Sequence, residues 1–240
     1  MYKEREYRSW VQSGDLIKFE VKESHTDLLI LAEKDLEKQA RASVLNLRKE
    51  IEEYIKKDRS FYTSLGPVEV GASAPDIVKV MAGAAIKAGV GPMAAIAGAI
   101  AEFVGRDLLQ FSGEVIVENG GDIFIKTRIP RRVGIYAGEG SPFTGKIAVE
   151  VGPDESGTGI CTSSGTVSHS LNFGVADAVC ILSDNTALAD AVATIAGNAV
   201  KSKDDIEKGI GIAKAIDGVK GVLIIVKDRM GTWGDIKIVR

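Results

Sequence analysis

The chain has 240 residues, of which 45% are hydrophobic and 26% are charged. This balance is typical of a globular protein and excludes intrinsic disorder and a membrane protein. With 30 basic and 33 acidic residues the formal net charge is -3, and only 6% of the residues are aromatic. Nucleic-acid binding needs a basic surface or stacking rings, so we expect no nucleic-acid partner.

The cysteine content and the lengths of the apolar segments indicate the cellular compartment to expect. Two cysteines are too few for a disulfide framework, and they lack the paired spacing of a zinc site. The first eight residues are rich in charge, and no apolar signal segment follows them. The longest uncharged run, residues 88–101, spans 14 residues, fewer than the roughly 20 that cross a bilayer. We expect a cytoplasmic protein with no membrane partner.

The first half of the chain is expected to begin with strands and continue with helices. Alternating apolar residues indicate a strand at 16–22, and residues 27–32 are a second candidate strand. Between residues 34 and 58, apolar residues recur every three or four positions, which predicts an amphipathic helix. Two more helices are expected within residues 75–107, broken at residues 89–92. The buried face of the second is marked by Met93, Ile96, Ile100 and Phe103.

The second half is expected to contain most of the sheet. Strands are predicted at 114–118, 123–127, 132–136, 146–151 and 178–182, with a polar stretch at 154–172. Helices at 185–199 and 203–215 precede strands at 219–226 and 236–239, which a loop containing residues 230–234 joins. Strands and helices are grouped rather than alternating singly. This predicts an α+β (mixed α/β) fold in a single domain, residues 1–240, with a mostly antiparallel sheet flanked by small-residue helices.

Two glycine-rich segments are candidates for a ligand site. Residues 140–146 match the spacing of a phosphate-binding P-loop, but Ile147 follows where a hydroxyl is needed and a strand comes next, so we reject it. The tract Asn119, Gly120, Gly121 and Asp122 lies between two apolar strands. Asn-Gly is a strong hairpin signal, so a plain turn is favoured over a loop in which the glycines admit a ligand beside the carboxylate.

Two polar segments follow. Residues 161–170 are dense in hydroxyl groups that suit a phosphate, and a nucleophile at Cys161 or a serine with His169 is conceivable, although no third orienting residue can be named. Asp190 and Thr194 stand four apart on a predicted helix and share one face. Their oxygens are ligands that Mg²⁺ prefers. A helix-start Asp with a Thr bonded to its own backbone explains the pair equally well.

Taken in chain order, these segments resemble the ApbE-like superfamily, whose best-known members are Mg²⁺-dependent flavin transferases that use FAD to attach FMN to a threonine of another protein. Residues 95–108 resemble its small-residue helix and 117–123 its Asn-x-Gly-Gly-Asp hairpin. Residues 162–165 resemble its Thr-Ser-Gly segment, and 189–194 its Ala-Asp-x-x-x-Thr metal helix. The chain looks closest to a short cytoplasmic branch in archaea and bacteria whose reaction is unassigned.

The resemblance implies an ApbE-like fold and a cleft that binds FAD, FMN or a related nucleotide with Mg²⁺. It assigns the metal to Asp190 and Thr194 and makes His169 the candidate catalytic residue. The residues that it places beside the flavin nucleotide are Asn119, Gly120, Gly121, Asp122, Ser164, Gly165 and Thr166.

Two departures from the family pattern bear on the reaction. The family motif His-x-x-Asp-Pro-x-Thr-Gly is reduced here to a histidine, His169, without the Asp-Pro and Thr-Gly pairs, and Glu102 stands where the family carries a basic residue. Both weigh against FMN transfer and leave a transferase-like or hydrolase-like enzyme of unassigned reaction. The alternative is an accessory partner in anaerobic sulfur assimilation, in homocysteine formation from aspartate semialdehyde, that binds a sulfur-transfer enzyme and a ferredoxin-type protein. An oligomer is compatible with either.

Overall fold

The computed structural model describes residues 14–165 and 173–240. Its centre is an eight-stranded sheet of order β1-β2-β3-β4-β7-β8-β9-β10, in which every neighbouring pair is antiparallel. A second, three-stranded antiparallel sheet has the order β11-β6-β5. The strands are β1 Ile17–Glu23, β2 Thr26–Ala32, β3 Val115–Asn119, β4 Asp122–Lys126, β5 Arg131–Gly134, β6 Ala148–Val151, β7 Thr158–Ser163, β8 Ala178–Ser183, β9 Val219–Val226, β10 Arg229–Gly234 and β11 Lys237–Val239.

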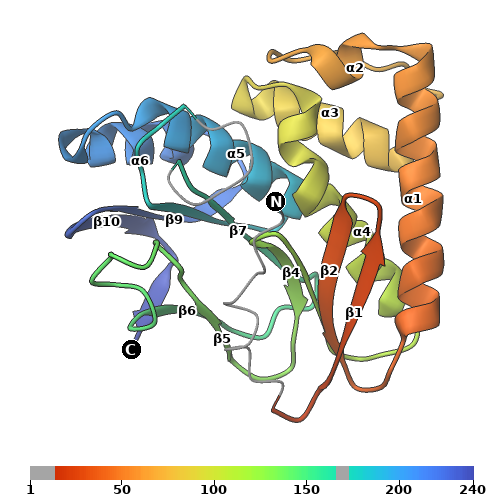
Figure 1. Ribbon diagram of the computed structural model, residues 1–240, viewed down its shortest axis with the longest axis horizontal. Coiled ribbons are helices and arrows are strands. Elements are labelled where there is room, and N and C mark those ends of the chain that lie inside the picture. Colours follow the sequence, from red (N-terminus) through yellow and green to blue (C-terminus); the bar gives the residue numbers. More distant parts are fainter. Residues whose placement is uncertain (1–13, 166–172) are drawn as a thin grey trace.

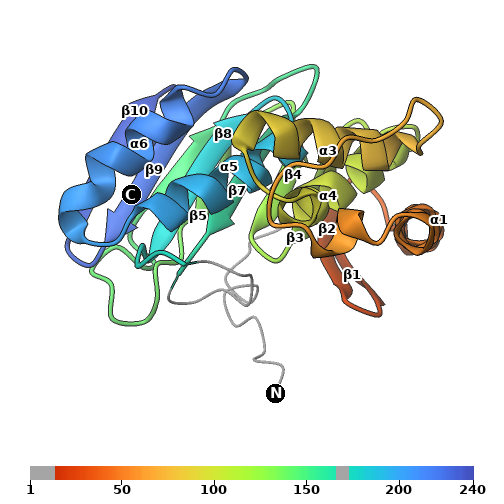
Figure 2. The same ribbon diagram turned by 90° about the horizontal axis from the view of Figure 1, so that it is seen from above.

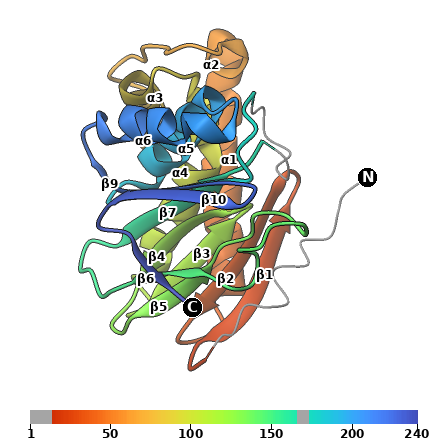
Figure 3. The same ribbon diagram turned by 90° about the vertical axis from the view of Figure 1, so that its left-hand side faces the viewer.

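The helices lie on one face of the large sheet, and the small sheet lies on the opposite side (Figure 1, Figure 3). The α-helices are α1 Glu37–Lys57, α2 Ser60–Thr63, α3 Asp76–Ala88, α4 Ile96–Leu108, α5 Thr186–Ala199 and α6 Ile206–Lys214, and short 3-10 turns η2 Pro92–Ala95 and η3 Lys203–Asp205 precede α4 and α6. This architecture confirms the predicted α+β class with a mostly antiparallel sheet.

Alternating side chains of the large sheet fill two apolar layers. On β8, Val179 and Ile181 face the helices, whereas Ala178 and Cys180 face the small sheet. The same alternation holds on β4, where Phe124 belongs to the helix layer and Ile125 to the layer between the sheets. Side chains on successive residues of a strand point to opposite faces, so a central strand buried on both sides is apolar throughout.

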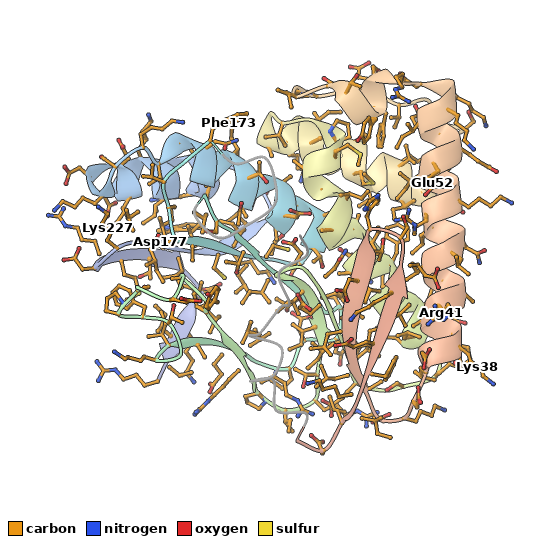
Figure 4. All side chains as sticks on the ribbon, in the orientation of Figure 1. Lys38, Arg41, Glu52, Phe173, Asp177 and Lys227 are labelled. Carbon is orange, nitrogen blue, oxygen red and sulfur yellow. The ribbon has the colours of Figure 1, made fainter. Side chains whose placement is uncertain are left out.

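The amphipathic pattern of residues 34–58 predicts α1 correctly. Its buried apolar side chains are Ala40, Val44, Leu47 and Ile51, which recur at helical spacing against the core. Charged residues occupy the opposite face, where Lys38, Arg41 and Glu52 project from the helix (Figure 4). Burial of one apolar stripe stabilises this helix.

Two glycines let α4 pack close to α5 and to β4. A Cβ atom at Gly98 of α4 would lie 2.3 Å from the Thr186 carbonyl oxygen of α5, and one at Gly105 would lie 2.2 Å from the Phe124 ring. Contacts this short are sterically excluded, so only glycine fits at these positions. α4 lies over β3 and β4 and α5 over β7 and β8 (Figure 2).

Three local expectations differ from the structure. Strand β7 lies inside the polar stretch 154–172, where no strand is predicted, and residues 230–234 belong to strand β10 rather than to a loop. Pairing with β9 and the packing of Trp233 on the core stabilise β10 despite its two glycines. On α4 the buried apolar side chains are Ala99, Ile100, Ala101, Val104 and Leu108, whereas Met93 of η2 and Ile96 and Phe103 of α4 are only partly buried.

Within residues 14–165 and 173–240, no single helix is both long and apolar enough to cross a membrane. The segments Asp76–Ala88 and Pro92–Leu108 reach that length and apolarity only as a pair, and the chain bends by 105° between them.

Candidate functional site

The Asn119–Asp122 tract is a tight turn between β3 and β4. Gly120 and Gly121 have φ angles of 71° and 104°, a region that glycine tolerates best. The Gly121 N–H donates to the Glu118 Oε1 at 2.8 Å, and its carbonyl accepts from the Thr162 N–H at 3.1 Å. The hairpin is therefore fixed against the end of β7.

Asn119 connects this hairpin to α4. Its side-chain Nδ2 donates a 3.1 Å hydrogen bond to the Ala97 carbonyl oxygen in the first turn of the helix. Asp122 pairs with Cys161 across β4 and β7, and strand alternation directs both toward the helices. The hairpin thus presents an amide and a carboxylate at the start of α4.

Asp190 links α5 to the same turn of α4. Its Oδ2 accepts a 2.9 Å hydrogen bond from the Gly98 N–H. Burial raises the pKa of Asp190 to about 7, against the opposing effect of the Gly98 and Ala97 N–H groups. The N-cap of α5 is Asn185, whose side chain accepts from the Leu188 N–H at 2.7 Å, so the interpretation of Asp190 as a helix-start residue is wrong.

Thr194 lies one turn after Asp190 on the same face of α5. In the described part of the chain its hydroxyl has no hydrogen-bond partner, so the suggested bond to its own backbone is absent there. Asn198 continues the face by one more turn. Asp190, Thr194 and Asn198 are all partly exposed on a helix that is otherwise mainly buried, and they form a polar stripe along it.

The far end of this polar stripe holds Phe173. The Asn198 Oδ1 accepts from the Phe173 N–H at 2.7 Å, and the Lys201 Nζ donates to its carbonyl oxygen at 2.6 Å. The Phe173 side chain is 60% exposed at this fixed position (Figure 4). The regular spacing of 190, 194 and 198 could have identified Asn198 from the sequence, whereas nothing in the sequence places Phe173 beside it.

Glu102 forms a second link between the two helices. It is buried on α4, and its Oε2 accepts from the Thr186 N–H, the first residue of α5, at 2.7 Å. Its Oε1 accepts from Arg106 at 2.7 and 2.9 Å. The acidic residue therefore has local partners that a basic side chain could not replace, because the Thr186 N–H requires an acceptor.

Cys161 is fully buried between the two helices and β4. Its Sγ donates to the Thr186 carbonyl oxygen at 3.3 Å. Burial, then the charges of Asp122 and Asp190, raise the pKa of the Cys161 thiol well above its ordinary value. A buried, protonated thiol is a poor nucleophile, so the geometry opposes the nucleophilic role considered for Cys161.

Ser164 and Gly165 continue directly from the end of β7. Ser164 is buried, and the Gly165 N–H donates to the Ala176 carbonyl oxygen at 2.9 Å. They follow Thr162 and Ser163, which border the hairpin. Thr166 and His169 lie outside the described residues.

The donor set at Asp190 and Thr194 fits Mg²⁺ held together with a phosphate-bearing ligand. Within the described ranges, no cluster of three or more His, Cys, Asp or Glu side chains could hold a metal ion. Mg²⁺ keeps several waters and is commonly bound by one or two carboxylates plus substrate phosphates, so a full protein cage is not required. Asp190 supplies a carboxylate, one oxygen of which also accepts from the Gly98 N–H, and Thr194 supplies a hydroxyl one turn further along α5.

Comparison with solved structures shows the fold. The flavinyl transferase ApbE of Pseudomonas stutzeri superposes with a TM-score of 0.55 and 14% identity, covering 91% of this chain and 93% of that chain. The flavin transferase ApbE of Vibrio cholerae gives a TM-score of 0.55 and 17% identity, covering 91% and 96%.

Sequence comparison gives closer relatives. The UPF0280 protein of Methanocella arvoryzae is 38% identical over 93% of this chain and 90% of its own length. That of Methanospirillum hungatei is 42% identical over 91% and 87%. A family model described as AbpE bacteria matches residues 8–221. The chain belongs to this ApbE-like family, together with the archaeal UPF0280 proteins.

Proposed function

We propose that this protein binds a flavin nucleotide, FAD or FMN, together with Mg²⁺ at the site bordered by the β3–β4 hairpin, the end of β7 and the polar stripe of α5. One observation carries the proposal: the 2.9 Å bond from the Gly98 N–H to Asp190, which joins α5 to the turn of α4 that Asn119 also contacts. The structural relatives named as flavin transferases support the same ligand class.

The chemistry of the stripe suggests an orientation for the ligand. Asp190 and Thr194 would hold Mg²⁺, which when bound would neutralise phosphate charge. Gly121, whose φ of 104° suits glycine best, would let a phosphate approach the hairpin backbone without meeting a side chain at that position. From Asp190 to Asn198 the helix rises about 12 Å, so the ring end would extend toward the exposed Phe173.

The site would bind and position the flavin nucleotide, and no particular reaction is assigned to it. Ser164, Gly165 and Thr166 would complete the nucleotide side of the site, and His169 stays the candidate acid or base. A transferase-like or hydrolase-like activity on the pyrophosphate is the enzymatic version. The accessory role in sulfur assimilation stays a prediction of the resemblance, and a native pull-down that recovers a sulfur-transfer enzyme with a ferredoxin-type protein would favour it.

Calorimetric titration tests the binding. Wild-type protein is titrated with FAD and with FMN, each with Mg²⁺ and with a chelator. We expect Mg²⁺-dependent binding that weakens by a factor of ten or more, the scale of lost metal ligands, in Asp190→Asn and Thr194→Val. Asn retains an acceptor for the Gly98 N–H, so the fold should persist. Asp76→Asn, at an exposed position on α3, is the matched control. Absence of binding by the wild type to both flavins would sink the proposal.

A further inference from the structure

The helices α4 and α5 are joined by two reciprocal hydrogen bonds, each from the start of one helix to a carboxylate of the other. Glu102 of α4 accepts from the Thr186 N–H at the start of α5, and Asp190 of α5 accepts from the Gly98 N–H in the first turn of α4. Each helix start carries N–H groups without partners in its own helix, together with the positive end of the helix dipole. Each helix therefore provides a carboxyl group that accepts a hydrogen bond from the start of the other.

Both hydrogen bonds lie close to the same residue, Thr186. Thr186 uses its N–H for Glu102 and its carbonyl oxygen for the Cys161 thiol, and that same carbonyl oxygen would lie 2.3 Å from a Cβ at Gly98. A shift of the start of α5 must therefore change the distance between Gly98 and Asp190. Asp190 follows Thr186 by four residues, about one helical turn.

We infer that Glu102 is a positioning residue for Asp190: by holding the first N–H of α5, it sets where the Asp190 carboxylate stands against α4. If Asp190 and Thr194 bind Mg²⁺, Glu102 also controls their affinity for the ion, and this consequence of the inference rests on the proposed function. Its structural part, the dependence of the Asp190–Gly98 contact on Glu102, holds in the metal-free protein.

The start of α5 offers a matched control. Asn185 caps the same helix by accepting from the Leu188 N–H, and this bond does not involve α4. Loss of the Asn185 side chain should weaken the helix start without removing the link between the helices. If Glu102 only stabilised the helix start, loss of either side chain would affect the Gly98–Asp190 contact equally. If Glu102 positions Asp190, only loss of Glu102 weakens that contact.

The first measurement is amide hydrogen exchange of Gly98 in the metal-free protein. The variants are Glu102→Leu, which removes the acceptor, Glu102→Gln, which keeps an oxygen for the Thr186 N–H, and Asn185→Ala. We expect the exchange rate of the Gly98 amide to rise about tenfold in Glu102→Leu, because the contact with Asp190 that protects it is weakened. In Glu102→Gln and in Asn185→Ala the rate should stay near the wild-type value. Equal acceleration in Glu102→Leu and Asn185→Ala at equal loss of Tm would overturn the inference.

The second measurement is calorimetric titration with Mg²⁺ alone and with Mg²⁺ plus FAD. Glu102→Leu should raise the Kd for Mg²⁺ about tenfold, while Glu102→Gln and Asn185→Ala stay near the wild-type value. An unchanged Kd in Glu102→Leu contradicts the functional consequence. If the wild type binds no Mg²⁺ either alone or with FAD, the proposed function fails while the exchange experiment still decides the structural part. If Glu102→Leu does not fold, Glu102→Asp, which is one methylene shorter, takes its place under the same criteria.

Discussion

Asp190 accepts a 2.9 Å hydrogen bond from the backbone N–H of Gly98, so a side chain of α5 and the backbone of α4 meet inside the candidate site. This contact depends on the absence of a side chain at Gly98. The segment that carries the proposed metal ligand is therefore sensitive to changes on a different helix.

Gly98→Ala should destabilise the protein. The added Cβ would lie 2.3 Å from the Thr186 carbonyl oxygen and 2.9 Å from the Asp190 Cβ, so α4 and α5 must separate. We expect a loss of about 1–3 kcal/mol, the usual cost of overpacking, measured by urea unfolding. Gly83→Ala on α3 is the control because nothing lies within 4 Å of its Cβ, and it should leave stability unchanged or raise it by about 0.5–1 kcal/mol. Equal effects at the two glycines would contradict the close packing.

Asn119→Asp should weaken flavin binding and lower Tm. The Asn119 Nδ2 donates to the Ala97 carbonyl oxygen, and a carboxylate at this position would place two acceptors against each other. The cost should be about 1–3 kcal/mol, the penalty for an unsatisfied buried polar pair. Thermal unfolding and calorimetric titration measure both effects. Asn46→Asp, at an exposed position on α1, should change neither.

Cys161 and Cys180 should resist thiol reagents in the native protein. Both are fully buried; burial chiefly raises the pKa of Cys180 to about 12 and that of Cys161 well above its ordinary value. They lie on opposite faces of the sheet, so they cannot form a disulfide with each other. A chromogenic disulfide reagent should modify neither thiol until urea is added, whereas Ala42→Cys, on the exposed side of α1, should react at once. Rapid native modification of Cys161 would revive its nucleophilic role.

Glu114→Gln should lower stability in a pH-dependent way. Burial alone would raise the pKa of Glu114, but hydrogen bonds from Arg131 at 2.9 Å and Thr127 at 2.8 Å outweigh it and hold the pKa below its ordinary value. A lowered native pKa stabilises the fold above the unfolded pKa of about 4.3, and this stability disappears as the pH falls through the native pKa.

The wild type should therefore exceed Glu114→Gln by about 1–3 kcal/mol near neutral pH, the cost of a lost charged hydrogen bond. The difference should shrink below about pH 4.5 as the wild-type carboxylate is protonated. Urea midpoints over this range measure it. Asp217→Asn serves as the control because the Asp217 side chain is 98% exposed beside Lys87. A difference that grows toward acid pH would have the wrong sign.

Phe173→Ala should weaken flavin binding without loss of stability. Its side chain is 60% exposed, so truncation removes little buried area, while a flavin ring that reaches it would lose a stacking contact of about 1 kcal/mol. Calorimetry should then show an affinity about fivefold lower, and flavin fluorescence should be quenched less on binding. Tyr62→Ala, an exposed aromatic on α2, should leave both unchanged. An unchanged affinity would show that the ring does not extend toward Phe173.

Local pattern was sufficient for much of the fold. The spacing of Val44, Leu47 and Ile51 predicts α1, and paired apolar runs predict β3 and β4 on either side of the Asn-Gly turn. It failed for β7 and β10, where strand identity comes from pairing with neighbours distant in sequence. The single domain over 1–240 and the assignment of the site residues stay predictions.

The sequence by itself determined the class of fold, the hairpin and the shared helical face of Asp190 and Thr194, because strand and helix periodicities are local. Only the tertiary structure decided that Asn119 contacts the start of α4, that Asp190 caps the same turn and that Glu102 holds the start of α5 in return. These contacts span 22, 92 and 84 residues. Hydrogen bonds over such separations form only when chain folding brings the partners together, so no local pattern encodes them.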